Sequence, residues 1–120
     1  MAAPQRTAAQ VSGGNGEEAA VALLERHGLS IVARNYRTRF GEIDIVARDG
    51  DSLVFVEVRM RAGPGFGGAA GSIGAHKQAR IAAAARLYLM QTRCRLPCRF
   101  DVVAIESGEA KWIRAAFSLE

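Results

Sequence analysis

The chain has 120 residues, a formal net charge of +4 and 49% hydrophobic residues. This length suffices for one compact domain with a core and excludes two domains of ordinary size. The basic charge favours polyanionic partners, with nucleic acid ahead of an anionic membrane surface. An arginine-rich composition that spreads positive charge everywhere is the alternative.

The sequence has no segment typical of a targeting peptide or a membrane span. Residues 1–14 lack the apolar region of a signal peptide, and no apolar run approaches the ~20 residues that cross a bilayer. Cys94 and Cys98 have neither a second cysteine pair nor a nearby histidine, so we expect thiols rather than a zinc site. We therefore expect a soluble, cytoplasmic protein without membrane partners.

The first predicted element is a helix that follows a disordered tail. Residues 1–13 are small and polar, and glycines stand at positions 13 and 14, which predicts disorder. Asn15 and Glu18 have the spacing of a capping box, so a helix is predicted over residues 16–27, with Gly28 as its C′ residue. Its apolar stripe consists of Ala20, Leu23, Leu24 and His27.

The remaining pattern alternates strands with one more helix. Strands are predicted over 31–36, 42–48, 53–60, 100–105 and, as a short edge strand, 112–117, and a helix over 75–90. Ile81, Ala84, Ala85 and Tyr88 face inward on this helix, and the glycine-rich residues 62–74 before it are predicted to be mobile. The fold class is α/β: one domain over 14–120, with a mixed sheet flanked by helices in the order α-β-β-β-α-β. The strand–helix–strand part should pair in parallel through a right-handed crossover.

Two predicted neighbouring strands each carry an acid among apolar residues, which is the most informative feature of the chain. Asp44 and Glu57 occupy these positions, although strands disfavour acids. A hairpin loop over 49–52, or over Gly50 and Asp51 alone, places Asp44 directly opposite Glu57. A loop of Asp49 and Gly50 instead places Glu42 opposite Glu57. In either register the carboxylates gather on one face, with opposed Cβ atoms ~5 Å apart.

Opposed carboxylates repel each other unless something neutralises them. A shared Mg²⁺ or Mn²⁺ ion would do so, because hard cations prefer oxygen ligands, and phosphodiester hydrolysis is then the expected chemistry. One protonated acid, or ion pairs with nearby arginines, would also remove the repulsion. The arginines available for such pairs are Arg34, Arg37, Arg39 and Arg59. Spacing alone leaves the metal site and the ion-pair network open.

Further charged residues could belong to the same site. Glu17 projects toward the apolar stripe of the first helix and could reach a metal, or it could simply favour the helix dipole. Arg59 shares a face with Glu57 and could orient water or neutralise phosphate, or balance the charge of Glu57. Lys77 and Arg80 open the second helix, where they could contact phosphate or form a solvated face.

Six short segments resemble the YraN family, an uncharacterised bacterial family with a predicted endonuclease-like fold. They are Gly16-Glu17-x-x-Ala20, Arg34-Asn35-Tyr36-Arg37, Gly41-Glu42-Ile43-Asp44, Val54-Phe55-Val56-Glu57-Val58-Arg59-x-Arg61, Lys77-Gln78-x-Arg80 and Arg99-Phe100-Asp101-Val102-Val103. They cover residues 14–117 in order. The resemblance implies a relationship to the PD-(D/E)xK nucleases near archaeal Holliday-junction resolvases. It further implies a restriction-endonuclease-like core and metal-dependent cleavage of DNA.

Carried over by position, the resemblance assigns a role to each candidate residue. Asp44 and Glu57 correspond to the two motif acids and metal ligands, and Glu17 to the acid on the first helix of the resolvases. The backbone carbonyl of Val58 would join the metal shell. Arg59 occupies the position of the motif lysine as a catalytic residue. The basic residues expected to contact nucleic acid are Arg34, Arg37, Arg39, Arg61, Lys77 and Arg80.

The sequence departs from the family pattern at Arg59. Arginine keeps the positive charge but cannot lose its proton at working pH, so proton transfer would suffer if the lysine performs it. The near-terminal histidine of the family is also missing, and Arg114 stands in that segment.

Three hypotheses follow from these residues. The first is a Mg²⁺-dependent nuclease acting on DNA, with branched or structured DNA as its substrate. The alternative is a nucleic-acid-binding protein of nuclease-like fold with weak or lost catalysis, and the third is a scaffold whose acids and arginines pair. DNA is expected ahead of RNA. A homodimer is the expectation from the resolvases, supported by the edge segment at Trp112.

Overall fold

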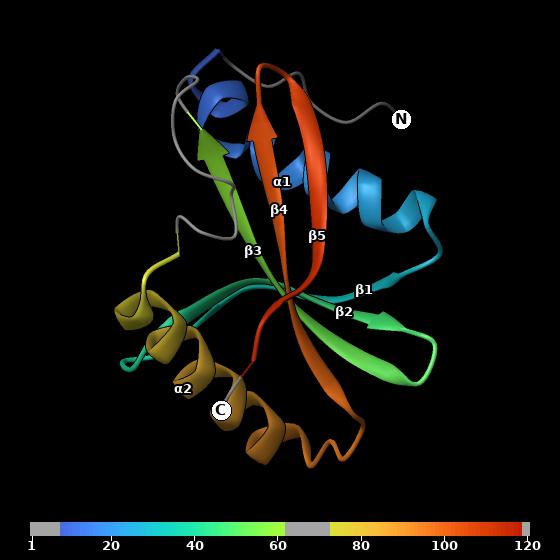
Figure 1. Cartoon of the computed structure of the whole chain (residues 1–120), viewed down its shortest axis with the longest axis vertical. Helices are drawn as coiled ribbons and strands as arrows, with labels where there is room; N and C mark the ends of the chain where they lie inside the picture. The colour runs from blue at the N-terminus through green and yellow to red at the C-terminus, as the bar shows by residue number, and fades with distance from the viewer. Residues whose placement is uncertain (1–7, 62–72, 119–120) are drawn as a thin grey trace.

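The computed structural model describes residues 8–61 and 73–118, which form two helices and one sheet of five strands (Figure 1). In chain order these are α1 (Ala8–Arg26), β1 (Ser30–Arg37), β2 (Glu42–Asp49), β3 (Ser52–Arg61), α2 (Ala75–Thr92), β4 (Cys98–Glu106) and β5 (Glu109–Phe117). The predicted α/β class and order of elements are confirmed, including the edge strand β5. Neither helix in the described part of the chain has the length and hydropathy needed to cross a membrane.

The strands follow one another across the sheet in the order β1-β2-β3-β4-β5. All neighbouring pairs are antiparallel except β3 and β4, which are parallel. Figure 1 shows the arrows of β3 and β4 pointing the same way beside each other. The predicted parallel pairing of the strands before and after α2 is therefore confirmed. The start of α2 follows the end of β3.

A two-residue turn fixes the register between β2 and β3. Asp49 pairs with Ser52 and Arg48 with Leu53, so Gly50 and Asp51 form the turn. Gly50 has a φ of 59°, a left-handed conformation that glycine adopts without steric penalty and that short hairpins need. Of the registers considered from the sequence, the structure has the one that aligns Asp44 with Glu57.

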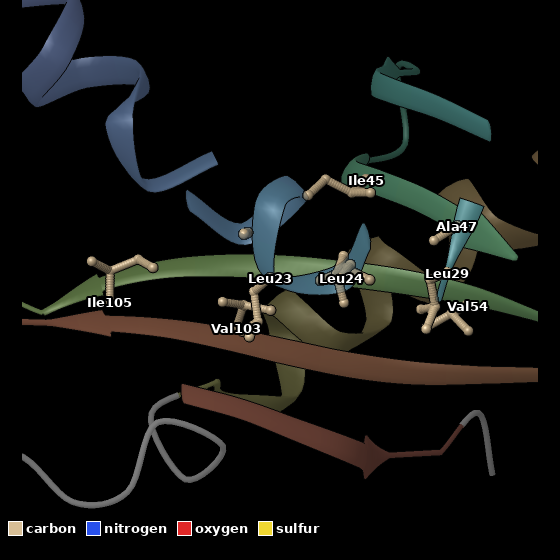
Figure 2. Close-up of a cluster of buried hydrophobic side chains, with 10 residues drawn as sticks. Leu23, Leu24, Leu29, Ile45, Ala47, Val54, Val103 and Ile105 are labelled. Carbon is tan, nitrogen blue, oxygen red and sulfur yellow. The ribbon is translucent and has the colours of Figure 1, made fainter. Parts of the chain in front are cut away.

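The two faces of the sheet carry separate hydrophobic clusters, as the alternation of side chains along the strands predicts. Leu23 and Leu24 of α1 pack on one face (Figure 2), against Leu29, Ile45, Ala47, Val54, Val56, Val103 and Ile105. The inward residues of α2 pack on the other face, against Val46, Leu53, Phe55 and Phe100. The predicted inward stripe of α2, Ile81, Ala84, Ala85 and Tyr88, is buried throughout.

The first helix is longer than the sequence pattern predicts. It begins at Ala8, so residues 8–13 are helical and Asn15 lies inside the helix rather than at its N-cap. Ala8, Ala9 and Gln10 are good helix formers, which explains why the helix extends past the glycines. The tail predicted for residues 1–7, and most of the mobile segment predicted over 62–74, lie outside the described residues.

His27 is exposed and does not belong to the buried stripe of α1. Its Nδ1 atom lies 2.9 Å from the carbonyl oxygen of Leu23, and its ring meets the ring of Trp112 edge-on at 5.3 Å. The polar ring nitrogens favour this position at the margin of the core, where one nitrogen has a partner and the other reaches solvent.

A buried carboxylate in β4 organises the edge strand β5. Asp101 is fully buried and accepts hydrogen bonds from Nε1 of Trp112 and from the backbone N–H of Ala115, both at 2.9 Å. Nε of Arg99 donates to the same carboxylate at 3.0 and 3.1 Å. The register of β4 with β5 shifts here, and Ala115 has a φ of 51°. The carboxylate therefore satisfies the backbone group that this bulge removes from the ladder.

Candidate functional site

The hairpin of β2 and β3 brings Asp44 and Glu57 together. The ladder between β2 and β3 ends with the pair Ile45 and Val56, and the next step of the same register aligns the two acids. Their carboxyl groups lie close enough for each to influence the protonation of the other. Glu57 is only 6% exposed, and Asp44 is half-buried. The predicted opposition of the two acids is present in the structure.

Burial and mutual repulsion change the acidity of both groups. Loss of hydration on burial, followed by the charge of Asp44, raises the pKa of Glu57 to about 7. Burial also raises the pKa of Asp44, while hydrogen bonds from Val58 and Glu57 oppose that rise. Glu57 therefore exchanges its proton near neutral pH rather than near its ordinary acidic value.

The backbone of β3 holds Asp44 in place. The N–H of Val58 donates a hydrogen bond of 2.8 Å to Oδ2 of Asp44. The side chain thus contacts the backbone of the neighbouring strand where the ladder between β2 and β3 ends. This bond directs the carboxylate toward the residue that follows Glu57, and it favours the ionised form of Asp44.

Lys77 approaches the acid pair from the first turns of α2. Its Nζ atom lies 3.4 Å from Oε2 of Glu57. The sequence predicts Lys77 as a phosphate contact or as part of a solvated face, so its place at the acid pair is a finding of the structure. One signal could have shown it: Lys77 precedes Ile81 by four residues and so continues the inward stripe of α2.

Glu17 lies near the pair but is held by residues of β1. Its Oε2 atom accepts hydrogen bonds from Nε of Arg34 at 2.8 Å and from Nδ2 of Asn35 at 3.1 Å. The charge of Glu17 contributes to the raised pKa of Asp44, which places the two groups in electrostatic contact. Arg34 also bonds Glu18 at 2.7 Å. Arg34, expected to contact nucleic acid, thus orients two carboxylates of α1.

The other basic residues lie around this centre. Arg37 is 3.8 Å from Glu42 at the ends of β1 and β2, and the guanidinium of Arg39 lies 5.5 Å from the ring centroid of Phe40. Arg59 is half-buried on β3, where it pairs with Ala104 of β4. Arg80 is exposed on α2. Arg61 ends β3, and its side chain lies outside the described part of the structure.

The donor set of the pair fits a hard divalent cation. Among residues whose side chains are described, no group of three His, Cys, Asp or Glu is close enough to hold a metal ion. Mg²⁺, however, usually binds through one or two carboxylates and keeps several waters. Asp44 and Glu57 form such a pair, and a cation would compete with the proton that Glu57 binds with raised affinity. The role of Glu17 as a further ligand stays a prediction, and in the structure its carboxylate bonds Arg34 and Asn35.

Comparison with known proteins places the chain in a family. A model of the uncharacterised protein family UPF0102 matches residues 16–105. The chain belongs to this family. The matched residues of UPF0102 include Glu17, Asp44, Glu57 and Lys77, whereas β5 lies beyond them.

Relatives from several bacteria are similar over nearly their whole length. The UPF0102 protein of Janthinobacterium sp. (strain Marseille) is 49% identical over 111 residues, which cover 92% of this chain and 90% of the relative. That of Cupriavidus taiwanensis is 50% identical, covering 97% and 89%. That of Methylibium petroleiphilum is 54% identical, covering 88% and 92%. The family is thereby shown, and the relationship to PD-(D/E)xK nucleases stays a prediction.

Proposed function

We propose that this UPF0102 protein is a metal-dependent nuclease that hydrolyses phosphodiester bonds of DNA, with branched or otherwise structured DNA as its substrate. The observation that carries the proposal is the pairing of half-buried Asp44 with buried Glu57, with the amine of Lys77 3.4 Å from Glu57. Two neighbouring acids that have lost part of their hydration oppose folding, so a site that keeps them needs a compensating function. Carboxylates with one adjacent ammonium suit phosphoryl transfer, where a cation and a metal both stabilise phosphate charge.

Asp44, Glu57 and the backbone carbonyl of Val58 would hold Mg²⁺ or Mn²⁺. The ion would supply a Lewis acid for the phosphoryl oxygen and make its bound water more acidic. Glu57 would release its proton to a solvent base when the ion binds. The Val58 N–H bond favours the ionised form of Asp44 and orients its carboxylate.

Lys77 offers a substitute for the lysine that the family pattern has at the position of Arg59. The motif lysine is replaced by Arg59 on β3, but an amine reaches the acid pair from α2 instead. Lys77 would contact a non-bridging oxygen of the scissile phosphate, and Arg59 would add fixed positive charge. Glu17, oriented by Arg34 and Asn35, would hold water at the edge of the site.

Cleavage assays test this assignment. Purified protein is incubated with labelled duplex, single-stranded and four-way-junction DNA in Mg²⁺ or Mn²⁺. We expect cleavage that EDTA stops and that Asp44→Asn, Glu57→Gln and Lys77→Ala each lower by at least ~100-fold, as loss of a charge-stabilising group does. Glu42→Gln is the matched control, because Glu42 lies on the same strand but pairs with Arg37. Cleavage that survives Asp44→Asn and Glu57→Gln unchanged rules out the assignment.

Arg59 favours a second candidate function, a DNA-binding protein without turnover. This alternative predicts binding that weakens steeply with salt, because basic residues release counterions from phosphates, but no cleavage in any metal. Arg59→Lys separates the two: a gain of cleavage identifies Arg59 as the missing group. The homodimer expected from the resolvases is measured in the same preparation by sedimentation, with and without junction DNA.

A further inference from the structure

The turn between β1 and β2 is fixed by one side chain. The hydroxyl of Thr38 donates to the carbonyl of Gly41 at 2.8 Å and accepts from the N–H groups of Phe40 and Gly41 at 3.0 and 3.1 Å. The N–H of Thr38 also donates to Gly41 at 2.9 Å. These bonds hold the turn through its backbone, so they do not depend on the side chain of Phe40.

Phe40 exposes a large aromatic ring on this turn. It is 53% exposed, and the guanidinium of Arg39 lies 5.5 Å from its ring centroid. Exposure of apolar surface to water is unfavourable, and the turn does not require the ring for its own packing. A ring beside a guanidinium is the combination that nucleic-acid-binding surfaces use for base stacking.

The turn is linked to the acid pair through α2 and through β2. A Cβ atom added to Gly41 would collide with the backbone carbonyl of Arg80, so the turn touches the backbone of α2. Arg80 follows Lys77 by about one helical turn, and Lys77 contacts Glu57. Asp44, on β2, follows Phe40 by four residues, or about 13 Å of extended chain.

We propose that Phe40 is a stacking surface for an unpaired base of DNA, with Arg39 and Arg80 contacting the adjacent phosphates. The inference rests on the proposed nuclease function and specifies its substrate. About 13 Å corresponds to about four base steps at 3.4 Å each. The substrate should therefore carry unpaired nucleotides within about four positions of the cleaved bond, as splayed arms, flaps and junctions do. In a continuous duplex the bases stack on each other and leave the ring without a partner.

The arginines near Phe40 also favour DNA over a protein as the binding partner. The guanidinium of Arg39 lies beside the ring, and Arg80 is exposed on the helix that Gly41 touches; this positive charge complements a phosphate backbone and disfavours an apolar protein surface. Arg37 lies one residue before Thr38 and adds a further cation, shared with Glu42.

Binding of DNA labelled with 2-aminopurine tests the proposal. The fluorophore is placed in the unpaired arm of a forked duplex, and a fully paired duplex of the same sequence is the reference. Titrations are performed in EDTA, so that no cleavage occurs. We expect wild-type protein to quench the fluorophore in the arm and to prefer the fork. Phe40→Ala should weaken fork binding about 10-fold, the loss expected for one stacked base, and change duplex binding less than 2-fold. Phe40→Trp should retain the preference.

Met90→Ala is the matched control, because Met90 is 72% exposed near the other end of α2. Equal melting temperatures of wild type and Phe40→Ala show that the turn is intact. If Phe40→Ala keeps the fork preference, or weakens both DNAs equally, the stacking role is wrong while the nuclease proposal stands. If wild-type protein binds neither DNA, both proposals fail. If Phe40→Ala instead turns a dimer into a monomer in sedimentation, the ring is a self-association surface and the inference is overturned.

Discussion

Asp44 and Glu57 bring two acids into contact inside the fold, with Lys77 as the cation facing Glu57. The folded state holds a proton on Glu57 up to a pKa of about 7, whereas the ordinary value is 4.5. Between these values the folded protein binds more protons than the unfolded chain, so the free energy of unfolding falls as pH rises. The contribution of Glu57 to the free energy of unfolding is fully present below pH ~4.5 and is lost above pH ~7. Its magnitude is about 3 kcal/mol.

Glu57→Gln should remove this pH dependence. At pH 5 the variant and wild type should have similar free energies of unfolding in EDTA, because the wild-type acid is largely protonated in the folded state. At pH 8 the variant should be more stable by about 2 kcal/mol, because an amide stays neutral beside Asp44. Urea denaturation at the two pH values measures the difference. A variant that is less stable than wild type at pH 8 would contradict the repulsion between Asp44 and Glu57.

Asp101 is a buried acid of the opposite kind. Its carboxylate accepts hydrogen bonds from Arg99, Trp112 and Ala115, so every neighbour that contacts it is a donor. Asp101→Asn places an NH₂ group among donors and weakens the ion pair with Arg99. We expect a loss of about 3 kcal/mol in the free energy of unfolding.

The same Asp→Asn change at Asp44 should be neutral or stabilising in EDTA, because it removes a charge beside Glu57. Urea denaturation at pH 7.5 compares the two variants directly. If Asp44→Asn destabilises as much as Asp101→Asn, then Asp44 is a structural acid and its role in a metal site is in doubt.

The sequence predicts that Asp44 lies opposite Glu57, but it does not predict that the ammonium group of Lys77 faces Glu57. Alternation along a strand and a short turn at Gly50 suffice to align Asp44 with Glu57, because both are local rules. Lys77 reaches Glu57 only after α2 docks on the sheet, so its place depends on tertiary packing. The role of Asp101 was hidden for the same reason, since its partners come from the bulge of β5.

The contact of the β1–β2 turn with α2 fixes how the second helix sits. Gly41 has no side chain, and a Cβ atom there would meet the backbone carbonyl of Arg80 rather than a flexible side chain. Backbone cannot yield without moving the helix, so the position requires glycine for its small size. This contact helps to place the first turns of α2, and therefore Lys77, over β3.

Gly41→Ala should destabilise the protein by about 2 kcal/mol, the magnitude of an overpacked contact. It should also move α2 away from the turn and weaken any cleavage that depends on Lys77. Gly74→Ala is the control, because Gly74 has open space around its Cα and a φ of −72°, which alanine adopts readily. Thermal denaturation measures both variants. Equal melting temperatures for Gly41→Ala and wild type would show that the contact is not tight.

Secondary structure was predictable where it follows from the periodicity of the sequence. The prediction failed where tertiary contacts determine the local backbone. The inward stripe of α2 follows from a repeat of three to four residues. The register shift between β4 and β5, with a positive φ at Ala115, depends on the carboxylate of Asp101 and leaves no local pattern. The early start of α1 at Ala8 shows that alanine propensity outweighed the cap pattern at Asn15.

The two helices cover opposite faces of one sheet, and the acid pair belongs to the strands that both helices share. Glu17 comes from α1, Lys77 from α2, and Asp44 and Glu57 from the hairpin between them. A ligand bound to this pair therefore contacts elements of both core clusters. Its binding energy should stabilise the domain as a whole rather than one local segment.

Mn²⁺ should therefore raise the melting temperature of the whole domain in a single transition. The rise should be larger at pH 8 than at pH 6, because the ion competes with the proton that Glu57 holds up to a pKa of about 7. With free Mn²⁺ at 100 times its Kd, the stabilisation is about 2.7 kcal/mol, or roughly 10 °C for a domain of this size. Thermal denaturation with and without EDTA measures it, and Glu57→Gln should remove most of the effect while Glu42→Gln retains it. A shift that is equal at both pH values, or that persists in Glu57→Gln, would mean that the ion binds elsewhere on the protein.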